Sequence, residues 1–465
     1  MSPTSSDPTS SDPRSGSFRR LVTIVIVALV VLCGALFAVA AVQGPRLSSV
    51  AEDLGAATPQ LRLTANQGVA PIDPDQVVIE PAVAFTIDTS ASLITVSFPQ
   101  GLAYATDYRL TIDGVHNPIR DTTAAFGHEF STGSASVLYL DRAEPGSGEA
   151  DRVYSAGVGG GERSVVYSAE RILEIARVGG LLAVSTATGE GTSDLHLVDL
   201  DSGAEETVIL PGDGLVSQLR SSASGQTLGF AFTEAGESLD KRYLRSLFTI
   251  DLTRGRDLVE ATALDGSPVH VLDWQFQPRG EGFLSLGVDR SLLRFDASGA
   301  PPTPLGEALT LGRITSDGSS LTLSDAFGFI ELDLTTLEEQ RLELSPVAGA
   351  APFPSEIARL SDGRLLAHAV LYDEASGAFD DLILLDDGSA ATELVGIGGD
   401  TSEVRSFTVT SNGQYAVLQV TPNVAAGRSD GYPVAPTPTT VTTVLVDLST
   451  GGVVASFDGM NLLWG

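Results

Sequence analysis

The feature that most constrains the fold is a repeat of short apolar runs that end in aspartate, spread over the last two thirds of the chain. The repeated residues are Asp199, Asp251, Asp296, Asp333, Asp386 and Asp447. A polar turn with glycine precedes another apolar run in several units, as at Ser361–Gly363. Aspartate accepts backbone N–H bonds in tight turns, and glycine supplies a positive φ. The pattern therefore predicts short strands joined by turns, repeated as one structural unit.

Each unit reads as strand a, tight turn, strand b, loop, strand c, tight turn, strand d, which is a propeller blade. Six units fit between Arg171 and Asp458. The remaining runs supply strands b, c and d of a seventh unit: Val137–Leu140, Arg152–Tyr154 and Ser164–Tyr167. Its strand a is then the C-terminal run Met460–Trp464. We predict a seven-bladed β-propeller over residues 134–465, closed by the C-terminal strand, with six or eight blades as alternatives.

The Ser-Asp-Gly turns at Ser316–Gly318 and Ser361–Gly363, and strand ends such as Leu197–Asp199, carry a resemblance. They resemble TolB-like and WD-repeat-like propellers of six to eight blades, over roughly residues 137–465. The resemblance implies a fold and leaves the function open, because propellers host binding and catalysis alike.

Residues 59–133 carry a different pattern of alternating apolar and polar residues. The runs are Leu61–Leu63, Val83–Ile87, Leu93–Phe98 and Tyr108–Ile112. Alternation predicts strands with one buried and one solvated face, as in an antiparallel β-sandwich. The strand Asp107–Val115 and the closing run Phe130–Thr132 resemble bacterial Ig-like domains of the S-layer type. The resemblance implies an Ig-like spacer on a cell surface.

The N-terminal region predicts a membrane anchor. Residues 1–20 are rich in Ser, Thr, Pro and Asp and read as a disordered cytoplasmic tail. The run Leu21–Val42 is apolar and uncharged, and long enough as a helix to cross a hydrocarbon core of roughly 30 Å. Arg19 and Arg20 precede it, which predicts a cytoplasmic N-terminus and an extracytoplasmic remainder in a single-pass protein of the cell membrane. Residues 43–58 are then a linker.

Two alternatives to the anchor stay open. A cleaved signal peptide would place its small-residue site at Ala38–Ala40. A lipoprotein signal would use Cys33 as the acylated residue, although Leu32 precedes it where such signals carry a small residue. The fold class predicted for the whole chain is an all-β ectodomain behind an N-terminal transmembrane helix, with the Ig-like sandwich followed by the propeller.

Charge and cysteine content exclude several classes of protein. The chain has 27 Lys and Arg against 59 Asp and Glu, a net charge of −32 at pH 7. Nucleic-acid binding needs a basic face, so no nucleic-acid partner is expected. A single cysteine excludes an internal disulfide framework and a zinc site built from several cysteines.

The candidate binding residues lie in the b–c loops on one face of the predicted propeller. Three of these loops are long: Thr233–Ser246, Tyr372–Asp381 and Thr421–Thr440. They carry Tyr243, Tyr372 and Tyr432, with Arg242 and Arg428 nearby. Exposed Tyr and Arg on loops of a rigid scaffold suit recognition of a protein or a glycan.

A search for catalytic motifs finds none. The sequence has no His-Glu-x-x-His, no Gly-x-Ser-x-Gly and no phosphate-binding Gly-x-x-x-x-Gly-Lys. His196, His270 and His368 fall in different blades and are not expected to share a metal. We predict no catalytic residue, metal ligand or cofactor.

The sequence therefore favours a membrane-anchored extracytoplasmic scaffold of the bacterial cell envelope, whose propeller binds an envelope protein or glycan. The alternative is a propeller enzyme, or a non-catalytic subunit of an envelope hydrolase or lyase, with carboxylates that converge in the central channel.

Overall fold

The computed structural model describes residues 21–31, 44–55, 58–236, 241–373, 377–396 and 401–464. The described chain is almost entirely β-strand and forms two compact units. The first comprises Met1–Asp53, Gln60–Ser97 and Tyr108–Phe130, and the second Leu54–Pro59, Phe98–Asp107 and Ser131–Gly465. We describe each unit by itself.

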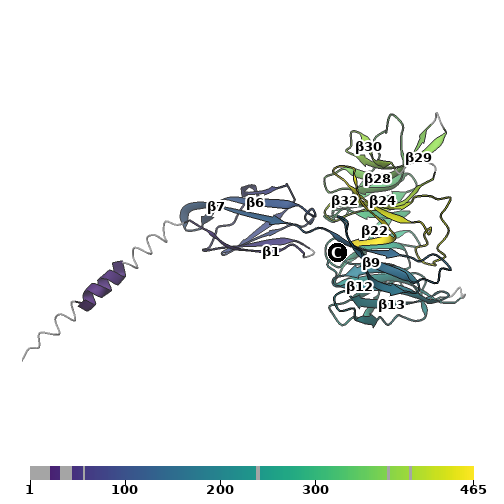
Figure 1. Cartoon of the computed structure of the whole chain (residues 1–465), viewed down its shortest axis with the longest axis horizontal. Coiled ribbons are helices and arrows are strands. Elements are labelled where there is room, and N and C mark those ends of the chain that lie inside the picture. The colour runs from purple at the N-terminus through teal and green to yellow at the C-terminus, as the bar shows by residue number, and fades with distance from the viewer. Residues whose placement is uncertain are drawn as a thin grey trace, which may run out of the picture. The chain divides into compact units, whose positions relative to one another are not determined.

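The first unit contains two antiparallel sheets (Figure 1). One has the order β1 (Leu47–Asp53), β2 (Gln60–Ala65), β5 (Leu93–Ser97), β4 (Thr86–Ser90), and the other β3 (Val77–Glu80), β6 (Asp107–Asn117), β7 (Arg120–Ser131). Alternate residues such as Leu61, Leu63, Ile94 and Val96 are completely buried, as the alternating pattern requires. Strand β1 lies in the interval 43–58 that we expected to be a linker. The Ig-like assignment itself stays a prediction.

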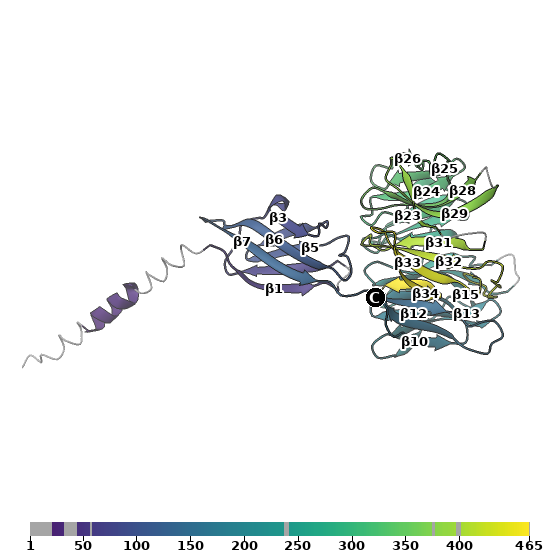
Figure 2. The ribbon, with the colours of Figure 1, turned by 45° about the horizontal axis from the view of Figure 1, so that its top comes forward.

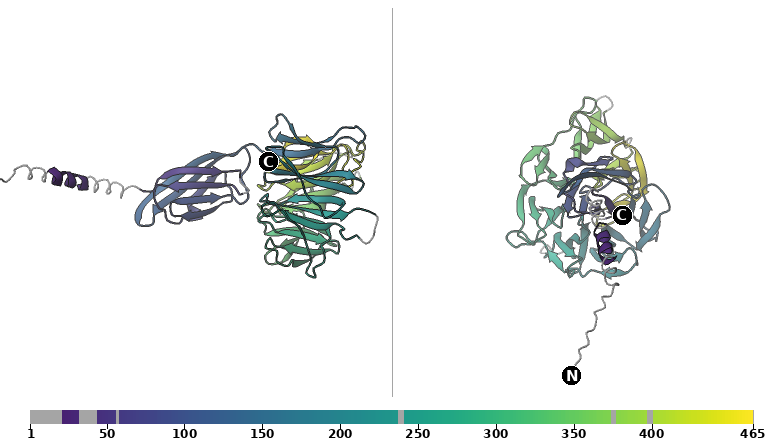
Figure 3. Two further views of the ribbon diagram at one scale, coloured as in Figure 1. Left: turned by 90° about the horizontal axis from the view of Figure 1, so that it is seen from below. Right: turned by 90° about the vertical axis from the view of Figure 1, so that its left-hand side faces the viewer.

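The second unit contains, within the described residues, seven four-stranded antiparallel sheets that follow one another around a ring (Figure 3, right). Blade 1 is β35 (Met460–Trp464), β8 (Ser136–Asp141), β9 (Asp151–Gly157), β10 (Ser164–Ala169). Blade 2 is β11 (Ile172–Val178), β12 (Leu181–Gly189), β13 (Thr192–Asp199), β14 (Glu205–Thr207). Blade 3 is β15 (Gly214–Ser221), β16 (Thr227–Glu234), β17 (Ser246–Asp251), β18 (Leu258–Glu260). Blade 4 is β19 (Val271–Phe276), β20 (Phe283–Gly287), β21 (Ser291–Phe295), β22 (Thr303–Glu307).

Three further blades complete the ring, and Figure 2 labels most of their strands. Blade 5 is β23 (Thr310–Ile314), β24 (Ser320–Asp325), β25 (Gly328–Asp333), β26 (Glu339–Arg341). Blade 6 is β27 (Phe353–Arg359), β28 (Leu365–Asp373), β29 (Ala378–Asp386), β30 (Ala391–Gly396). Blade 7 is β31 (Glu403–Val409), β32 (Tyr415–Thr421), β33 (Thr442–Asp447), β34 (Val453–Asp458).

The C-terminal strand closes the ring as the sequence predicts. Strand β35 pairs with β8 from the beginning of the propeller, with Met460 opposite Leu140 and Trp464 opposite Val137. Met460 is 2% exposed and packs in one apolar cluster with Leu140 and Ile172. Pairing first and last strands in one sheet removes two open edges, so the closure is confirmed by the strand register.

The core lies between the blades. Leu195 and Leu197 of blade 2 pack in one cluster with Phe230 and Phe248 of blade 3. The middle strands are therefore buried on both faces, which explains their almost uninterrupted apolar runs. Trp274 is completely buried, and its ring lies so close to Gly229 that a Cβ there would come within 2.4 Å of it.

The repeated aspartates form turns. Asp199 Oδ1 accepts hydrogen bonds from the backbone N–H groups of Asp201 and Ser202, at 3.1 and 2.7 Å. The bonds from Ser202 hold the pKa of Asp199 below its usual range. Asp386 departs from this pattern, because it is 1% exposed and also accepts a bond from the backbone N–H of Ser345 at 2.6 Å. Its neighbour Asp387 caps that turn, with a pKa lowered to about 2 by bonds from Ser389.

The predicted fold class is wrong in its transmembrane element. Among the described residues, no helix is long and apolar enough to cross a membrane. The described part of the N-terminal helix covers residues 21–31. The remainder of the expected span, residues 32–42, lies outside the described residues. The same holds for the tail 1–20 and for the alternative signals at Cys33 and Ala38–Ala40.

Candidate functional site

Strand a of each blade lies innermost, and strands a of neighbouring blades contact one another from β35 through β11, β15, β19 and β23 to β27. In the described structure each of these seven strands contains a register shift, a β-bulge that turns side chains out of the regular alternation. Side chains near the bulges bond to the next blade. Glu174 Oε2 accepts the Leu219 N–H at 2.8 Å, and Gln275 Nε2 donates to the Gly312 carbonyl at 2.7 Å.

Charged side chains of the inner strands also form ion pairs and hydrogen bonds with residues of other blades. Arg220 pairs with Asp273 at 2.7 Å. Arg313 of blade 5 pairs with Glu356 of blade 6 at 3.2 Å and donates to the carbonyl of Phe407 in blade 7 at 2.7 Å. Asp273 and Glu356 are thus each paired with an arginine of the preceding blade.

Glu174 is the one inner-strand carboxyl with a strongly shifted pKa among the described residues. Burial raises its pKa to about 7, against the opposing effects of the Leu219 N–H and the nearby Arg220. The carboxyl is therefore partly protonated at neutral pH, and folding becomes coupled to its proton.

The loop between β16 and β17 places Tyr243 against the core instead of in solvent. Its ring makes edge-on contacts with Phe232 and Phe248, with centroids 5.9 and 5.4 Å away. Arg242 is exposed and lies over the Tyr243 ring at 4.9 Å. Of these two predicted binding residues, the arginine is the one that presents its side chain to solvent.

The expected exposure of Tyr432 is wrong, because this residue is 8% exposed. Its hydroxyl donates to Asp151 Oδ2 at 2.6 Å, and its ring lies between the guanidinium groups of Arg142 and Arg171, 4.0 and 4.6 Å away. Burial and the Asp151 bond raise the pKa of Tyr432. Sequence alone cannot reveal this, since the partners lie far away along the chain. Arg428, in the same loop, is exposed.

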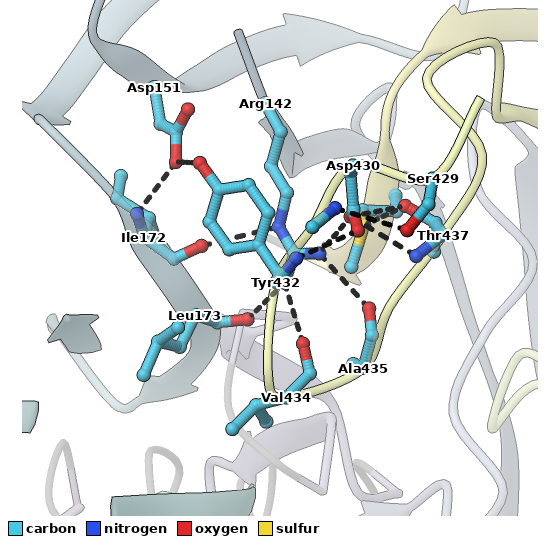
Figure 4. A network of polar contacts seen from close by, with 12 residues as sticks. Arg142, Asp151, Ile172, Leu173, Ser429, Asp430, Tyr432, Val434, Ala435 and Thr437 are labelled. Carbon is cyan, nitrogen blue, oxygen red and sulfur yellow. Dashed lines mark hydrogen bonds and ion pairs between the residues drawn. The ribbon is translucent and has the colours of Figure 1, made fainter. Parts of the chain in front are cut away.

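Arg142 is the centre of this network (Figure 4). Its guanidinium donates to Asp430 at 2.5 Å and to the carbonyls of Val434 and Ala435 in the β32–β33 loop of blade 7. It also donates to the carbonyls of Ile172 and Leu173 on β11 of blade 2. Arg142 itself follows β8 of blade 1. Through Arg142, the long loop 422–441 of blade 7 is therefore connected to blades 1 and 2, where the ring closes; we call this loop the clasp.

The loop expected over Tyr372–Asp381 is shorter than predicted, because strand β28 extends to Asp373 and strand β29 begins at Ala378. Tyr372 lies directly opposite Phe379, and Val370 lies opposite Asp381. The Tyr372 and Phe379 rings lie 5.0 Å apart and are 42% and 68% exposed. Tyr372 is the predicted tyrosine that the structure does present to solvent.

The exposed aromatic side chains concentrate in one sector. Four exposed aromatic residues occur in the part of the chain that the structure describes: Phe327, Phe353, Tyr372 and Phe379. All four belong to blades 5 and 6 and lie on or beside the b–c and d–a connections, at one end of the strands. We call these four residues the aromatic sector. The three phenylalanines are not among the binding residues predicted from the sequence, which are tyrosines and arginines of the long loops.

No group of three or more His, Cys, Asp or Glu side chains in the described ranges is arranged to hold a metal ion.

No protein-family model matches the chain, and no curated protein matches its sequence. Solved structures with similar arrangements include TolB from Acinetobacter baumannii, at 13% identity and a TM-score of 0.39, covering 84% of this chain and 82% of that one. A putative 6-phosphogluconolactonase from Bacteroides fragilis has 13% identity and a TM-score of 0.41, covering 71% and 98%. Oligogalacturonate lyase from Vibrio parahaemolyticus has 13% identity and a TM-score of 0.41, covering 67% and 92%. The chain is thus similar to TolB-like and other propeller proteins, while its assignment as a propeller rests on its own strand order.

Proposed function

We propose that this protein is a binding scaffold whose propeller recognises another protein through the aromatic sector. The observation that carries the proposal is that, among the described residues, every exposed aromatic side chain belongs to two neighbouring blades. Aromatic side chains are enriched at protein interfaces, where a few of them supply most of the binding energy. Phe327, Phe353 and Phe379 are 87%, 64% and 68% exposed, so each has a large apolar area to bury.

A protein partner with apolar side chains fits this surface better than a polyanion does. The net charge of −32 disfavours acidic ligands and favours a neutral or basic partner. The rigid propeller supports the sector, because β28 and β29 pair without a register shift up to Tyr372 and Phe379. Binding therefore requires little ordering of the sector, which reduces the entropic cost of association.

A photo-crosslinking experiment tests this function. A benzophenone amino acid replaces Phe379, and in the control chain it replaces Val453, which is 59% exposed on the outermost strand β34. We expect a discrete crosslinked protein from position 379 and none from position 453. Binding of that purified partner should weaken at least 10-fold in Phe353→Ser/Phe379→Ser and stay unchanged in Val453→Ser.

Two outcomes would count against the proposal. One is equal crosslinking from both positions. The other is a partner whose affinity does not change in the double variant, including a glycan that binds both chains equally. The location outside the cytoplasm is a separate prediction, and it is checked by whether protease added to intact cells degrades the propeller.

A further inference from the structure

One histidine differs from the others in its combination of partners. All five histidines are described. His116 bonds a backbone carbonyl, His128 pairs with Glu52, and His270 lies beside the buried Ser246. His368 lies between an exposed serine hydroxyl and a carboxylate.

The side chains of Ser355, His368 and Asp381 form a continuous line of hydrogen bonds across blade 6. Ser355 on β27 places its Oγ 2.8 Å from His368 Nδ1 on β28. His368 Nε2 lies 2.5 Å from Asp381 Oδ1 on β29. Asp381 Oδ2 accepts the backbone N–H of Val404 on β31 at 2.9 Å, which fixes the orientation of the carboxylate. The bulge between Pro354 and Glu356 is what turns Ser355 toward the imidazole.

The partners determine where the protons lie. An ionised Asp381 only accepts hydrogen bonds, so the neutral imidazole carries its proton on Nε2 and exposes the Nδ1 lone pair to Ser355. The Ser355 hydroxyl has a second acceptor, the His368 carbonyl at 3.1 Å. A hydroxyl beside a basic nitrogen that a carboxylate orients is the arrangement that activates a serine nucleophile. In this blade the two ring nitrogens exchange places relative to the Ser-His-Asp triad, since Nδ1 faces the serine and Nε2 faces the carboxylate.

Exposure separates this set from a similar one in blade 2. His196 lies between Thr186, at 3.2 Å from Nε2, and Glu205, at 2.8 Å from Nδ1. The Thr186 side chain is buried, at 9% exposure, so its hydroxyl is closed to a substrate. Ser355 is exposed, whereas the side chains of His368 and Asp381 are only 12% and 24% exposed. A substrate therefore reaches the hydroxyl while the base and its carboxylate stay sheltered.

The surroundings indicate the chemistry of the substrate. His368, Val370 and Tyr372 alternate along β28 and so point to one face, and their strand partners Asp381 (opposite Val370) and Phe379 (opposite Tyr372) point to the same face. The bond from Val404 identifies this face as the one toward blade 7. Tyr372 and Phe379 are then about 13 Å along the strand from the imidazole, at roughly 3.3 Å per residue. An acyl chain of medium length spans that distance.

We propose that Ser355, His368 and Asp381 form an acyl-transfer site that hydrolyses carboxylic esters whose acyl chain lies against Tyr372 and Phe379. The Ser355 Oγ attacks the ester carbonyl carbon, and its proton passes to His368 Nδ1. The bond from the carbonyl carbon to the alcohol oxygen breaks, and the leaving alcohol takes the proton from Nδ1. Water then attacks the acyl-serine, gives a proton to Nδ1, and Ser355 leaves with that proton as the carboxylic acid is released.

Covalent labelling tests the nucleophile directly and does not depend on the protein partner proposed above. A fluorophosphonate probe should add one adduct to the full-length protein, on the peptide that contains Ser355. Ser355→Ala should abolish the adduct, and His368→Gln should slow labelling at least about 100-fold. Asp381→Asn should slow labelling as well, and this variant replaces His368→Gln in the test if His368→Gln does not fold. The matched controls His196→Gln and Ser406→Ala should label like the unaltered protein, because Ser406 bonds Gln419 instead of an imidazole.

Ester hydrolysis tests the substrate class. The value of kcat/KM for p-nitrophenyl octanoate should exceed that for the acetate at least 10-fold. Tyr372→Ser/Phe379→Ser should remove this preference by slowing octanoate hydrolysis, whereas Val453→Ser should keep it. Absence of a probe adduct on the folded protein would overturn the proposal, as would labelling that persists in both His368→Gln and Asp381→Asn. Labelling without any preference for the longer ester would overturn the assigned acyl chain.

Discussion

Replacing Arg142 with methionine is the sharpest test of how the ring is held closed. The substitution keeps most of the apolar stem and removes the guanidinium that joins blades 7, 1 and 2. The side chains of Arg142 and Asp430 are only 5% and 3% exposed, so the ion pair between them is almost fully desolvated. Removing one member leaves the Asp430 carboxylate buried without its counter-charge.

The expected loss is large for a single substitution. Breaking a buried ion pair by removing one partner costs about 3–5 kcal/mol, because the remaining charge stays desolvated. Arg142 also donates to four backbone carbonyls, which lose their donor in the variant. These contributions overlap, since they concern one side chain, so we expect about 3–5 kcal/mol in total.

Tryptophan fluorescence during urea unfolding of the full-length chain measures this loss. The chain has two tryptophans, Trp274 and Trp464, and both lie in propeller strands, so the signal reports on this unit. The matched control is Arg152→Met in the same blade, where the Arg152–Glu149 pair is 41% and 63% exposed with a separation of 3.5 Å. An exposed pair of this kind contributes about 0–1 kcal/mol.

A loss in Arg142→Met no larger than that in Arg152→Met would refute this account of ring closure. The double variant Arg142→Met/Asp430→Leu refines the test. Its loss in the free energy of unfolding should be at least about 1 kcal/mol smaller than the sum of the losses in the two single variants, because it leaves neither charge buried without its partner. Strict additivity would show that the pair itself does not stabilise the clasp.

Three further perturbations follow from the same contacts. Gly229→Ala should lower the free energy of unfolding by about 1–3 kcal/mol, because the added Cβ overpacks against Trp274. In the control Gly212→Ala the added Cβ meets nothing within 4 Å, so the free energy of unfolding should change by under about 1 kcal/mol. Equal losses for the two variants in urea titrations would contradict the close packing at Gly229. The pKa of Glu174 is raised in the folded state, so between about pH 5 and pH 7 the folded protein binds a proton that the unfolded chain has released. The free energy of unfolding, measured relative to that of Glu174→Gln, should therefore fall as the pH rises through this range. A difference between the two proteins that does not change with pH would contradict the raised pKa. Deletion of residues 460–465 removes β35 and should lower the melting temperature and increase proteolysis of blade 1; unchanged values would show that the ring is stable without its closing strand.

The local chemistry of turns made much of the architecture predictable. The aspartates that end the apolar runs form the turns expected of them, as Asp199 and Asp447 show by accepting backbone N–H bonds two and three residues ahead. The run Val83–Ile87 was less informative, because only its last two residues belong to a strand, β4. The predicted membrane span was wrong as judged from the described residues, among which no helix is long and apolar enough to cross a membrane.

The candidate sites were much less predictable. Tyr243, Tyr372 and Tyr432 look alike in sequence, each in a polar stretch between apolar runs. One packs on phenylalanines, one is exposed on a strand pair, and one is buried between two arginines. Ser355 and His368 had no motif to mark them, because their meeting depends on a bulge and on the register of two strands.

The sequence by itself determined the repeat, the turn residues and the strand that closes the ring, because these follow from periodicity and from bonds between residues close in the chain. The tertiary structure decided which side chains meet. The Arg142 network joins residues up to 293 positions apart, and the line from Ser355 to Asp381 crosses three strands. Such contacts depend on the radial packing of blades, which brings distant segments together at distances that no local pattern encodes.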